Sequence, residues 1–390
     1  IRMVRLCLPR HNPAMPATLD EHYSYLIDRT KLERYQAAIE QAVEPGSAVL
    51  DLGCGSGLLG LIALRTGASK VLFVDESPII EVARRTVKEA GFSDRAEFFQ
   101  ANSFDLSLPE HVDIVVCDHI GYFGFDYGVL SMLSDARQRF LKADGIVIPS
   151  EIVLMLAPVE SESCRTIVSR WQSEAVPEDF HWVRAPAANA THAVDLGADE
   201  LISDAADLGT MVLGEEVDDF LSWNAEFIAD RDATLDGILG WFDCTLTGGI
   251  RMSNSPLVDD ALDRPQAFLP LEQPVAVTKG ERICATIMAR HLDHVIAWVV
   301  ELPEQGQRFA LTTFNGLLID NSALGRCKPD RIAQLNSRGL ARQIILSYCD
   351  GNRTVVEIEA LIENAHSDLF PSAQATRSFI RAVLAADTGE

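Results

Sequence analysis

The stretch that decides the fold is Val49–Gly57, which reads V-L-D-L-G-C-G-S-G. The short apolar run Ala48–Leu52 leads into its glycines, and Leu58–Leu64 then shows apolar residues at helical spacing. This pattern predicts a strand, a tight turn and a helix. Glycines in the turn allow positive φ angles and let a ligand approach the backbone, because no Cβ stands in the way. We therefore expect a ligand-binding turn at the carboxyl end of a buried strand.

Acidic residues mark this turn more specifically. Asp51 stands two residues before the first glycine, and a second predicted strand ends at Asp75, where a carboxylate can accept both hydroxyls of a ribose about 20 residues after such a loop. A Lys-Ser or Lys-Thr pair does not follow the glycines, which disfavours a phosphate-binding P-loop. The alternative is an ordinary strand–turn–helix without a ligand. The combination resembles the donor site of class I methyltransferases, which implies S-adenosyl-L-methionine as cofactor and S-adenosyl-L-homocysteine as product. The expected contacts from these two strands are Asp51, Gly53, Cys54, Gly55, Gly57, Asp75 and Glu76.

Composition narrows the class of protein. The 390 residues suffice for two or three domains, and no apolar run approaches the roughly 20 residues that span a bilayer, so no membrane partner is expected. The net charge of −24 disfavours nucleic acid as a partner. It suits a cationic or amine substrate, although many globular proteins are simply acidic. Residues Ile1–Arg10 lack the apolar run of a signal peptide, and the eight cysteines lack C-x-x-C spacing, which together predict a cytoplasmic protein with reduced thiols.

Strand and helix signals alternate through about residue 150. They predict an α/β domain of Rossmann type over residues 1–150, with a doubly wound parallel sheet. Within this domain, helical spacing from Leu19 to Val43 precedes the first strand. Asn102 and Ser103 follow the third strand, where they are expected to meet the adenine edge of the donor. The predicted strands are Ala48–Leu52, Lys70–Val74, Ala96–Gln100, Val112–Cys117 and Ile146–Ile148.

The remaining chain changes character twice. Many short strands separated by turns predict an antiparallel β-barrel or sandwich over residues 151–304. From residue 305 to 390 we expect a small separate domain, which opens with a hairpin, Phe309–Asp320, around Asn315-Gly316. Three helices follow, and Thr354 with Glu357 forms a predicted capping box at the start of the second. The predicted helices are Ser337–Cys349, Val355–Ala365 and Ala373–Ala386.

The catalytic candidates lie in the loop C-D-H-I-G-Y-F-G-F-D-Y-G-V-L, Cys117–Leu130, after the fourth strand. Ligands of open α/β sheets bind off the carboxyl ends of the strands. Methyl transfer is an in-line displacement that needs an aimed, uncharged nucleophile and sometimes a proton acceptor. Loop carboxylates would hold a cationic or amine substrate, while singly each such residue is more often structural. The catalytic candidates are Asp118, His119, Asp126 and Tyr127, and Asp118 is also expected to touch the donor. His291 and His294 are better explained by a turn than by a metal site.

These segments resemble the protein arginine methyltransferases, from V-L-D-L-G-C-G-S-G-L-L-G through Ile120–Pro149 to the strand G-W-F-D-C-T-L, Gly240–Leu246. The resemblance implies a Rossmann-like domain, a β-barrel and a homodimer formed through an arm. It places Lys31 where the family's arginine meets the donor carboxylate. The family's two guanidinium-binding glutamates fall on Asp118 and Tyr127, and its Thr-His-Trp loop falls on L-D-R, Leu262–Arg264. Because a shorter carboxylate and a phenol cannot form the same bidentate fork, a nitrogen other than that of arginine becomes attractive as acceptor.

The tail Pro329–Ile358 resembles PqqD-like domains, which recognise the leaders of ribosomally synthesised peptides. The resemblance implies a winged-helix-like α+β domain that pairs the leader with a sheet edge. The resulting hypothesis is an N-methyltransferase that modifies a residue of a precursor peptide while its C-terminal domain holds the leader. Three alternatives stay open: a tail used only for assembly, an arginine methyltransferase relative acting on folded proteins or small amines, and a catalytically silent subunit that presents a peptide.

Overall fold

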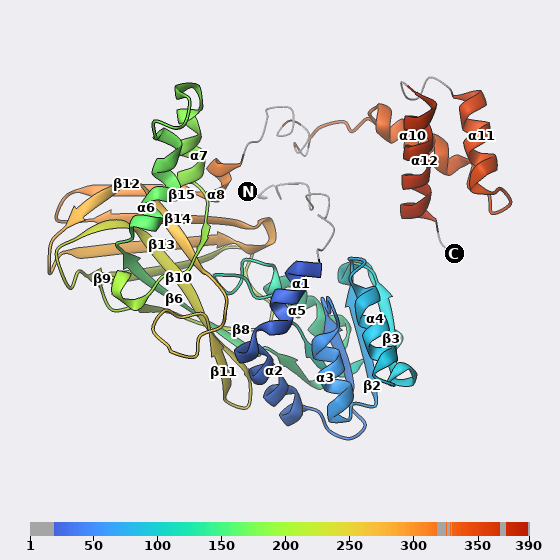
Figure 1. Ribbon diagram of the computed structural model, residues 1–390, viewed down its shortest axis with the longest axis horizontal. Coiled ribbons are helices and arrows are strands. Elements are labelled where there is room, and N and C mark those ends of the chain that lie inside the picture. Colours follow the sequence, from blue (N-terminus) through green and yellow to red (C-terminus); the bar gives the residue numbers. More distant parts are fainter. Residues whose placement is uncertain (1–18, 318–324, 326–327, 329, 367–371, 389–390) are drawn as a thin grey trace. The chain divides into compact units, whose positions relative to one another are not determined.

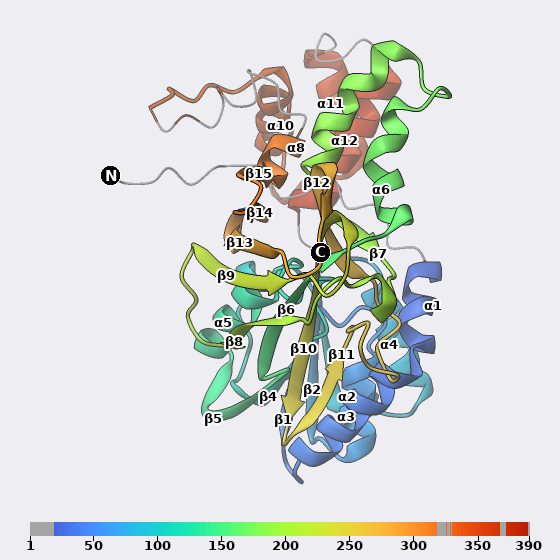
Figure 2. The same ribbon diagram turned by 90° about the vertical axis from the view of Figure 1, so that its left-hand side faces the viewer.

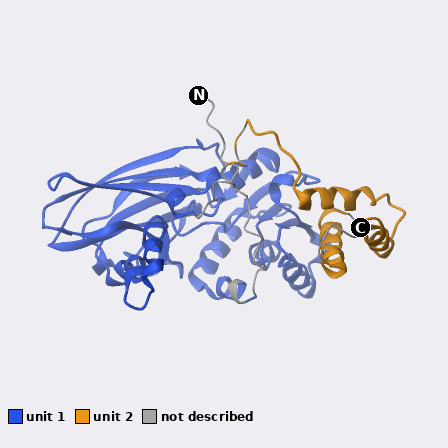
Figure 3. Cartoon of the chain, turned by 90° about the horizontal axis from the view of Figure 1, so that it is seen from above, with its two compact units in different colours: residues 1–319 blue, residues 320–390 orange. Residues whose placement is uncertain are grey.

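The computed structural model describes residues 19–317, 325, 328, 330–366 and 372–388. The chain divides into two compact units, residues 1–319 and residues 320–390 (Figure 3). The sequence-based division after residue 304 differs from this one, because residues 307–316 form a strand and a short helix of the first unit. Among the described residues, none of the helices combines the length and the apolar character that crossing a membrane demands.

A five-stranded parallel sheet forms the first layer of unit 1, with the strand order β3-β2-β1-β4-β5. Every residue of β1 is buried, as expected for a central strand with helices on both faces. The strand order reverses between β1 and β4, and this switch point is where ligands of such sheets bind. The fold is thus Rossmann-like, as predicted. Its strands are β1 (Ala48–Leu52), β2 (Lys70–Asp75), β3 (Ala96–Gln100), β4 (Val112–Val116) and β5 (Leu141–Ile148).

The N-terminal helical region consists of two helices rather than one. Asp28 separates them, because its side chain accepts a hydrogen bond from the Lys31 amide (3.0 Å) and so begins a new helix. The second helix packs its buried Tyr35, whose hydroxyl donates to the Cys117 carbonyl at the end of β4 (2.9 Å). That bond fixes the helix over the switch point. The helices of this layer are α1 (Leu19–Ile27), α2 (Arg29–Ala42), α3 (Leu58–Thr66), α4 (Ile80–Glu89) and α5 (Val129–Arg139), with 3₁₀ turns η1 (Ser93–Arg95) and η2 (Ser103–Asp105).

The second part of unit 1 consists of two antiparallel sheets (Figures 1 and 2). Trp298 crosses from one to the other, since its indole nitrogen donates to the Pro270 carbonyl (2.8 Å). Of the predicted barrel or sandwich, the antiparallel strands are confirmed and the barrel is not, because the described strands pair within two separate sheets. One sheet has β7 (His192–Val194), β12 (Gln266–Val277), β10 (Ala233–Thr247), β6 (Glu151–Val159) and β8 (Ala206–Val212), with β11 (Ile250–Ser253) beside β10; the other has β15 (Gln307–Thr312), β14 (Val295–Leu302), β13 (Arg282–Arg290) and β9 (Leu221–Ile228).

A helical arm projects from these sheets (Figures 1 and 2). It comprises α6 (Glu162–Ser169), η3 (Arg170–Gln172), η4 (Glu178–Val183) and α7 (Arg184–Ala188). Asp236 on β10 anchors its base, because this buried carboxylate accepts from the Ser161 amide (2.9 Å) and from Arg165 (2.8 and 3.0 Å). The remaining short elements of unit 1 are η5 (Ala198–Glu200), η6 (His291–Asp293) and α8 (Thr313–Gly316).

The hairpin predicted for Phe309–Asp320 is wrong in its described part. Residues 307–312 form β15 against β14, and the Asn315-Gly316 pair lies in α8. The Thr312 side chain accepts from the Phe314 amide (3.3 Å) and caps this helix, so the chain turns into a helix where a hairpin turn was expected. Residues 318–320 of the prediction lie outside the described residues.

Unit 2 contains α10 (Ser337–Ser347), α11 (Val355–Ala365) and α12 (Ala373–Asp387). The predicted capping box is confirmed, since the Thr354 amide donates to Glu357 (2.8 Å) and the Glu357 amide donates to the Thr354 hydroxyl (3.3 Å). The described residues of this unit contain no strand, so the sheet edge implied by the PqqD resemblance has no counterpart among them. The unit has its own apolar core, formed by Ile345, Ile358, Ile362, Ile380, Val383 and Leu384.

Candidate active site

The donor loop, which we define as residues 53–57, lies at the carboxyl end of β1. Gly53 and Gly55 have φ angles of +69° and +52°, a region that glycine adopts at little cost. A Cβ at Gly53 would come within 2.3 Å of His119 Nε2, and one at Gly55 would come within 2.9 Å of His22 Cε1. The loop therefore needs glycine both for its conformation and for the space above it. In this structure the rings of His119 and His22 lie over this glycine cradle, at the edge of the sheet where ligands of such folds bind.

Asp51 lies beneath the donor loop. Its side chain is buried and accepts a hydrogen bond from the Gly60 amide in the first turn of α3 (2.7 Å). Burial raises the pKa of Asp51 to about 7, against the opposing effect of the Gly60 hydrogen bond. Asp51, which was predicted to contact the donor, therefore supports the donor loop from below. Its carboxyl group connects β1 to α3 and holds the loop between them.

This buried carboxyl group predicts a pH dependence of stability. Because the pKa of Asp51 is higher in the folded chain (about 7) than in the unfolded chain (about 3.9), the folded state binds more protons between these values. The free energy of unfolding should therefore fall as the pH rises from about 4 to 7. Asp51→Asn should flatten this slope in urea titrations at pH 5 and pH 7.5, whereas Asp94→Asn on the exposed η1 turn should leave it unchanged. An equal slope in wild type and Asp51→Asn would contradict the assignment.

The acidic end of β2 completes the donor side. Asp75 accepts from the Gly55 amide with Oδ2 and from the Ser77 amide with Oδ1, each at 2.8 Å. Each oxygen keeps a further lone pair, so the carboxylate can still accept the hydroxyls of a ribose. It also fixes the backbone of the loop that it faces.

The other predicted donor contacts cluster near Asp75. Asn102 caps η2 by accepting from the Phe104 amide and donates to the exposed Glu76 (3.0 Å each). Ser103 and Cys54 are buried, and burial raises the pKa of the Cys54 thiol well above its usual value. Asn102 and Glu76 therefore bond to each other near Asp75, and the buried Cys54 thiol stays protonated.

Asp118 is the centre of charge on the acceptor side. Its Oδ2 accepts from Lys31 Nζ (2.8 Å), and its Oδ1 faces Arg264 Nη2 and the Tyr35 hydroxyl, both at 3.4 Å. Burial by itself would raise the pKa of Asp118, but the charges of Arg264 and Lys31 outweigh it and hold the pKa below its usual value. Asp118 is therefore an ionised carboxylate that already has two cationic partners.

Of the other catalytic candidates, His119 lies closest to the donor loop, with its ring over Gly53. Asp126 turns back on its own loop, where Oδ1 accepts from the Phe123 amide (3.0 Å), and burial raises its pKa. Tyr127 is half exposed and packs edge-on against Tyr122, with ring centroids 5.5 Å apart. The structure thus brings His119 to the donor loop, holds Asp118 between Lys31 and Arg264, and gives Asp126 a partner within its own turn.

Sequence reasoning did not select Arg264 and Tyr35 as site residues. Arg264 lies just before β12, and Tyr35 lies in helix α2. Both therefore reach Asp118 from segments that are distant from it in sequence. The signal for Arg264 was its place in the L-D-R triplet, Leu262–Arg264, where the family resemblance places the Thr-His-Trp loop. In the sequence, Tyr35 is one of several apolar residues at helical spacing, so its position indicated packing rather than a role in the site.

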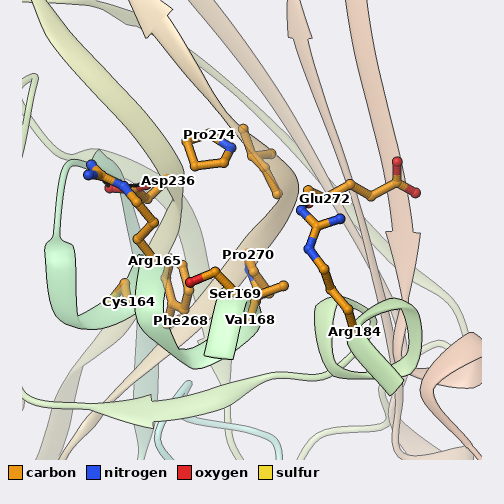
Figure 4. Close-up of a pocket in the computed structure, with 11 residues that line it drawn as sticks. Cys164, Arg165, Val168, Ser169, Arg184, Asp236, Phe268, Pro270, Glu272 and Pro274 are labelled. Atoms are coloured by element: carbon orange, nitrogen blue, oxygen red, sulfur yellow. Dashed lines mark hydrogen bonds and ion pairs between the residues drawn. The ribbon is translucent and has the colours of Figure 1, made fainter. Parts of the chain in front are cut away.

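A cavity of about 30 Å³ in unit 1 is lined by residues of α6, α7, β10 and β12, among them the Arg165–Asp236 pair (Figure 4). It contains none of the predicted site residues. A smaller one of about 20 Å³ lies between Asp126 and His294. His291 begins the 3₁₀ turn η6, as expected, and no cluster of potential metal ligands occurs among the described residues.

Comparison with known proteins agrees with this arrangement. Residues 35–189 match the family model "Ribosomal protein L11 methyltransferase (PrmA)". The chain is 34 % identical over 140 residues to a probable protein arginine N-methyltransferase 6 of Arabidopsis thaliana, covering 35 % of this chain and 32 % of that one. It is 27 % identical over 272 residues to the arginine N(omega)-methyltransferase of Streptomyces achromogenes, covering 67 % and 74 %.

A solved structure shares the fold. The Trypanosoma brucei PRMT1 enzyme–prozyme heterotetrameric complex with AdoHcy superposes with a TM-score of 0.67 at 21 % identity, covering 75 % of this chain and 96 % of that one. The glycine cradle, the acidic β2 end and these similarities agree on the donor. The chain is an S-adenosylmethionine-dependent methyltransferase of the class I fold that resembles the protein arginine methyltransferases.

Proposed function

We propose that this methyltransferase transfers a methyl group to a nitrogen of a ribosomally synthesised precursor peptide, and that residues 320–390 bind the leader of that peptide. The observation that carries the proposal is a second compact unit with its own apolar core, joined to a complete methyltransferase fold. The segment that resembles PqqD-like domains covers α10 and the start of α11, apart from Pro329, which lies outside the described residues.

The surface of α11 suggests how a leader would be held. Val355, Val356 and Leu361 are exposed apolar side chains on this helix, and Val356 is 69 % exposed. Apolar side chains in such positions commonly mark interaction sites. We infer that this surface of α11 contacts the leader.

The chemistry of the proposal follows from the donor side. S-adenosylmethionine, when bound, supplies an electrophilic methyl group on a sulfonium. Asp75 would accept the ribose hydroxyls, and the loop that it holds through the Gly55 amide would border the donor. His119, whose ring lies over Gly53, would accept the proton that the nitrogen loses. Asp118 orients the loop through its bonds to Lys31 and Arg264.

A second candidate function is methylation of arginine in proteins or as a free amino acid. It is favoured by the relatives, one of which is named an arginine N(omega)-methyltransferase and matches over most of its length. The site weighs against it, because Tyr127 stands where the resemblance places a second glutamate and Asp118 is already paired. The peptide and arginine proposals share the donor and differ only in the acceptor.

We also propose that the chain forms a homodimer through its helical arm. Phe180 and Trp182 on η4 are 53 % and 59 % exposed, and large aromatic side chains at such exposure are enriched in protein interfaces. The related Trypanosoma brucei structure is a heterotetrameric complex. A dimer would cover the two aromatic side chains.

A cytoplasmic location completes the proposal. The structure describes six cysteines, and all are free thiols. Free, largely buried thiols suit a reducing compartment. Peptides are also synthesised there, so enzyme and substrate would share one compartment.

The peptide proposal predicts that removal of residues 320–390 harms only leader-dependent methylation. Tethering commonly raises apparent affinity by about 10² or more, so kcat/KM for a leader-bearing precursor encoded beside the gene should fall about a hundredfold. Activity toward the same peptide without its leader should not change. Mass spectrometry with deuterated donor would follow the transfer, and calorimetry with S-adenosylhomocysteine would confirm an intact donor site. Equal kcat/KM in the full and shortened chains would contradict leader binding.

A further inference from the structure

The acceptor side holds an unusual internal arginine. Arg264 Nη1 donates to the Ile120 carbonyl in the acceptor loop (2.7 Å), and Nη2 faces Asp118 Oδ1 (3.4 Å). The Arg264 side chain is only 11 % exposed, and that of Asp118 is 22 % exposed. A guanidinium group of the chain itself thus lies beside Asp118 in the loop Cys117–Leu130, which we call the acceptor loop.

The charges around Asp118 leave no free carboxylate there. Lys31, whose side chain is 5 % exposed, holds Oδ2, while Arg264 and the Tyr35 hydroxyl face Oδ1. The loop's other carboxylate, Asp126, accepts from the Phe123 amide. Lys31 and Arg264 therefore bring two positive charges to the single negative charge of Asp118, the carboxylate that both contact. A cationic acceptor that approached Asp118 would meet repulsion from Arg264 and Lys31.

We propose that Arg264 is a built-in occupant of the guanidinium position, which makes the site select an uncharged nitrogen over a cationic acceptor. The inference rests on the proposed peptide methylation and names its substrate class: a side chain whose nitrogen carries a lone pair at neutral pH, such as imidazole. Arg264 acts as a specificity-determining residue, because it fills the space and neutralises Asp118.

The chemistry balances with such an acceptor. The imidazole nitrogen lone pair forms the new bond to the methyl carbon as the carbon–sulfur bond breaks. The electron pair of that bond stays on sulfur and yields neutral S-adenosylhomocysteine. The methylimidazolium formed then releases the proton of its other ring nitrogen to His119, the proton acceptor proposed above, and the ring becomes neutral again. The acceptor needs no deprotonation before the transfer.

Ethylguanidinium is a direct probe of the occupied position. The full chain saturated with S-adenosylhomocysteine would be titrated with ethylguanidinium chloride, as wild type, Arg264→Ala and Arg264→Lys. Arg34→Ala is the matched control, since Arg34 is a surface arginine paired with the exposed Asp260. We expect Arg264→Ala to bind the probe at least about tenfold more tightly than the other three proteins, a difference that calorimetry resolves. Equal binding by wild type and Arg264→Ala would overturn the inference.

A second measurement needs only the wild-type protein, so it holds even if Arg264→Ala does not fold. Two forms of one precursor peptide, with histidine or arginine at the modified position, would compete for the enzyme. Preferential methylation of the histidine form supports the inference, and preferential methylation of arginine overturns it. Methylation of neither form, with S-adenosylhomocysteine binding intact and ethylguanidinium bound only by Arg264→Ala, would overturn the peptide function while supporting the occupied guanidinium position.

Discussion

Gly55→Val is expected to abolish binding of the methyl donor. Gly55 has a φ of +52°, and a Cβ there would come within 2.9 Å of the His22 ring. A β-branched residue in this region costs about 1–3 kcal/mol and shifts the backbone. The Gly55 amide would then lose its bond to Asp75, which positions the ribose-binding carboxylate. We expect calorimetric affinity for S-adenosylhomocysteine to fall about a hundredfold or more.

The control for this substitution, Gly91→Val, separates the effect of backbone strain from a specific loss of donor binding. Gly91, after α4, has a φ of +81°, and a Cβ there would meet no heavy atom within 4 Å. Gly91→Val should therefore lower the unfolding free energy by about 1–3 kcal/mol and leave donor affinity unchanged. Unchanged affinity in Gly55→Val would place the donor elsewhere.

Asp118→Asn is expected to remove most turnover while donor affinity changes little. The carboxylate neutralises Lys31 and Arg264, which are both largely buried, and loss of one partner of such a network typically costs about 3–5 kcal/mol when fully buried. Since Asp118 is partly exposed, we expect a loss of about 2 kcal/mol in unfolding free energy. The displaced cations would distort the acceptor loop, so kcat should fall about a hundredfold or more.

Asp260→Asn is the matched control for Asp118→Asn. Asp260 also pairs with an arginine of the chain, but its side chain is 67 % exposed. Stability should change by less than about 0.5 kcal/mol, and kcat should stay at the wild-type value. Kinetics under saturating donor, with urea titrations, would compare the two variants. Full turnover in Asp118→Asn would move the acceptor away from this loop.

Local patterns predicted the donor half of the molecule well. The apolar strands, the glycine loop and the acidic end of β2 can each be recognised from a few consecutive residues. The parallel sheet that contains them agrees with the prediction. The helix break at Asp28 and the helix over Asn315-Gly316 were missed, because single capping side chains decide them. Residue periodicity averages over such positions.

The features that the sequence did not predict depend on long-range contacts. Whether ten antiparallel strands form one barrel or two sheets depends on which edges pair, and strand patterns do not encode that choice. Arg264 reaches Asp118 across 146 positions of sequence, so its pairing was invisible in the chain order. The paired state of Asp118 changes the expected chemistry of the acceptor loop, where unpaired carboxylates had suggested a cationic substrate.

The most direct test of the account is to locate the transferred methyl group. The full chain would be incubated with deuterated S-adenosylmethionine and a leader-bearing precursor peptide encoded beside its gene, and the product would be sequenced by tandem mass spectrometry. The account predicts a labelled methyl group on an uncharged nitrogen of the core peptide, in an imidazole ring above all. A label on an arginine guanidinium would contradict it.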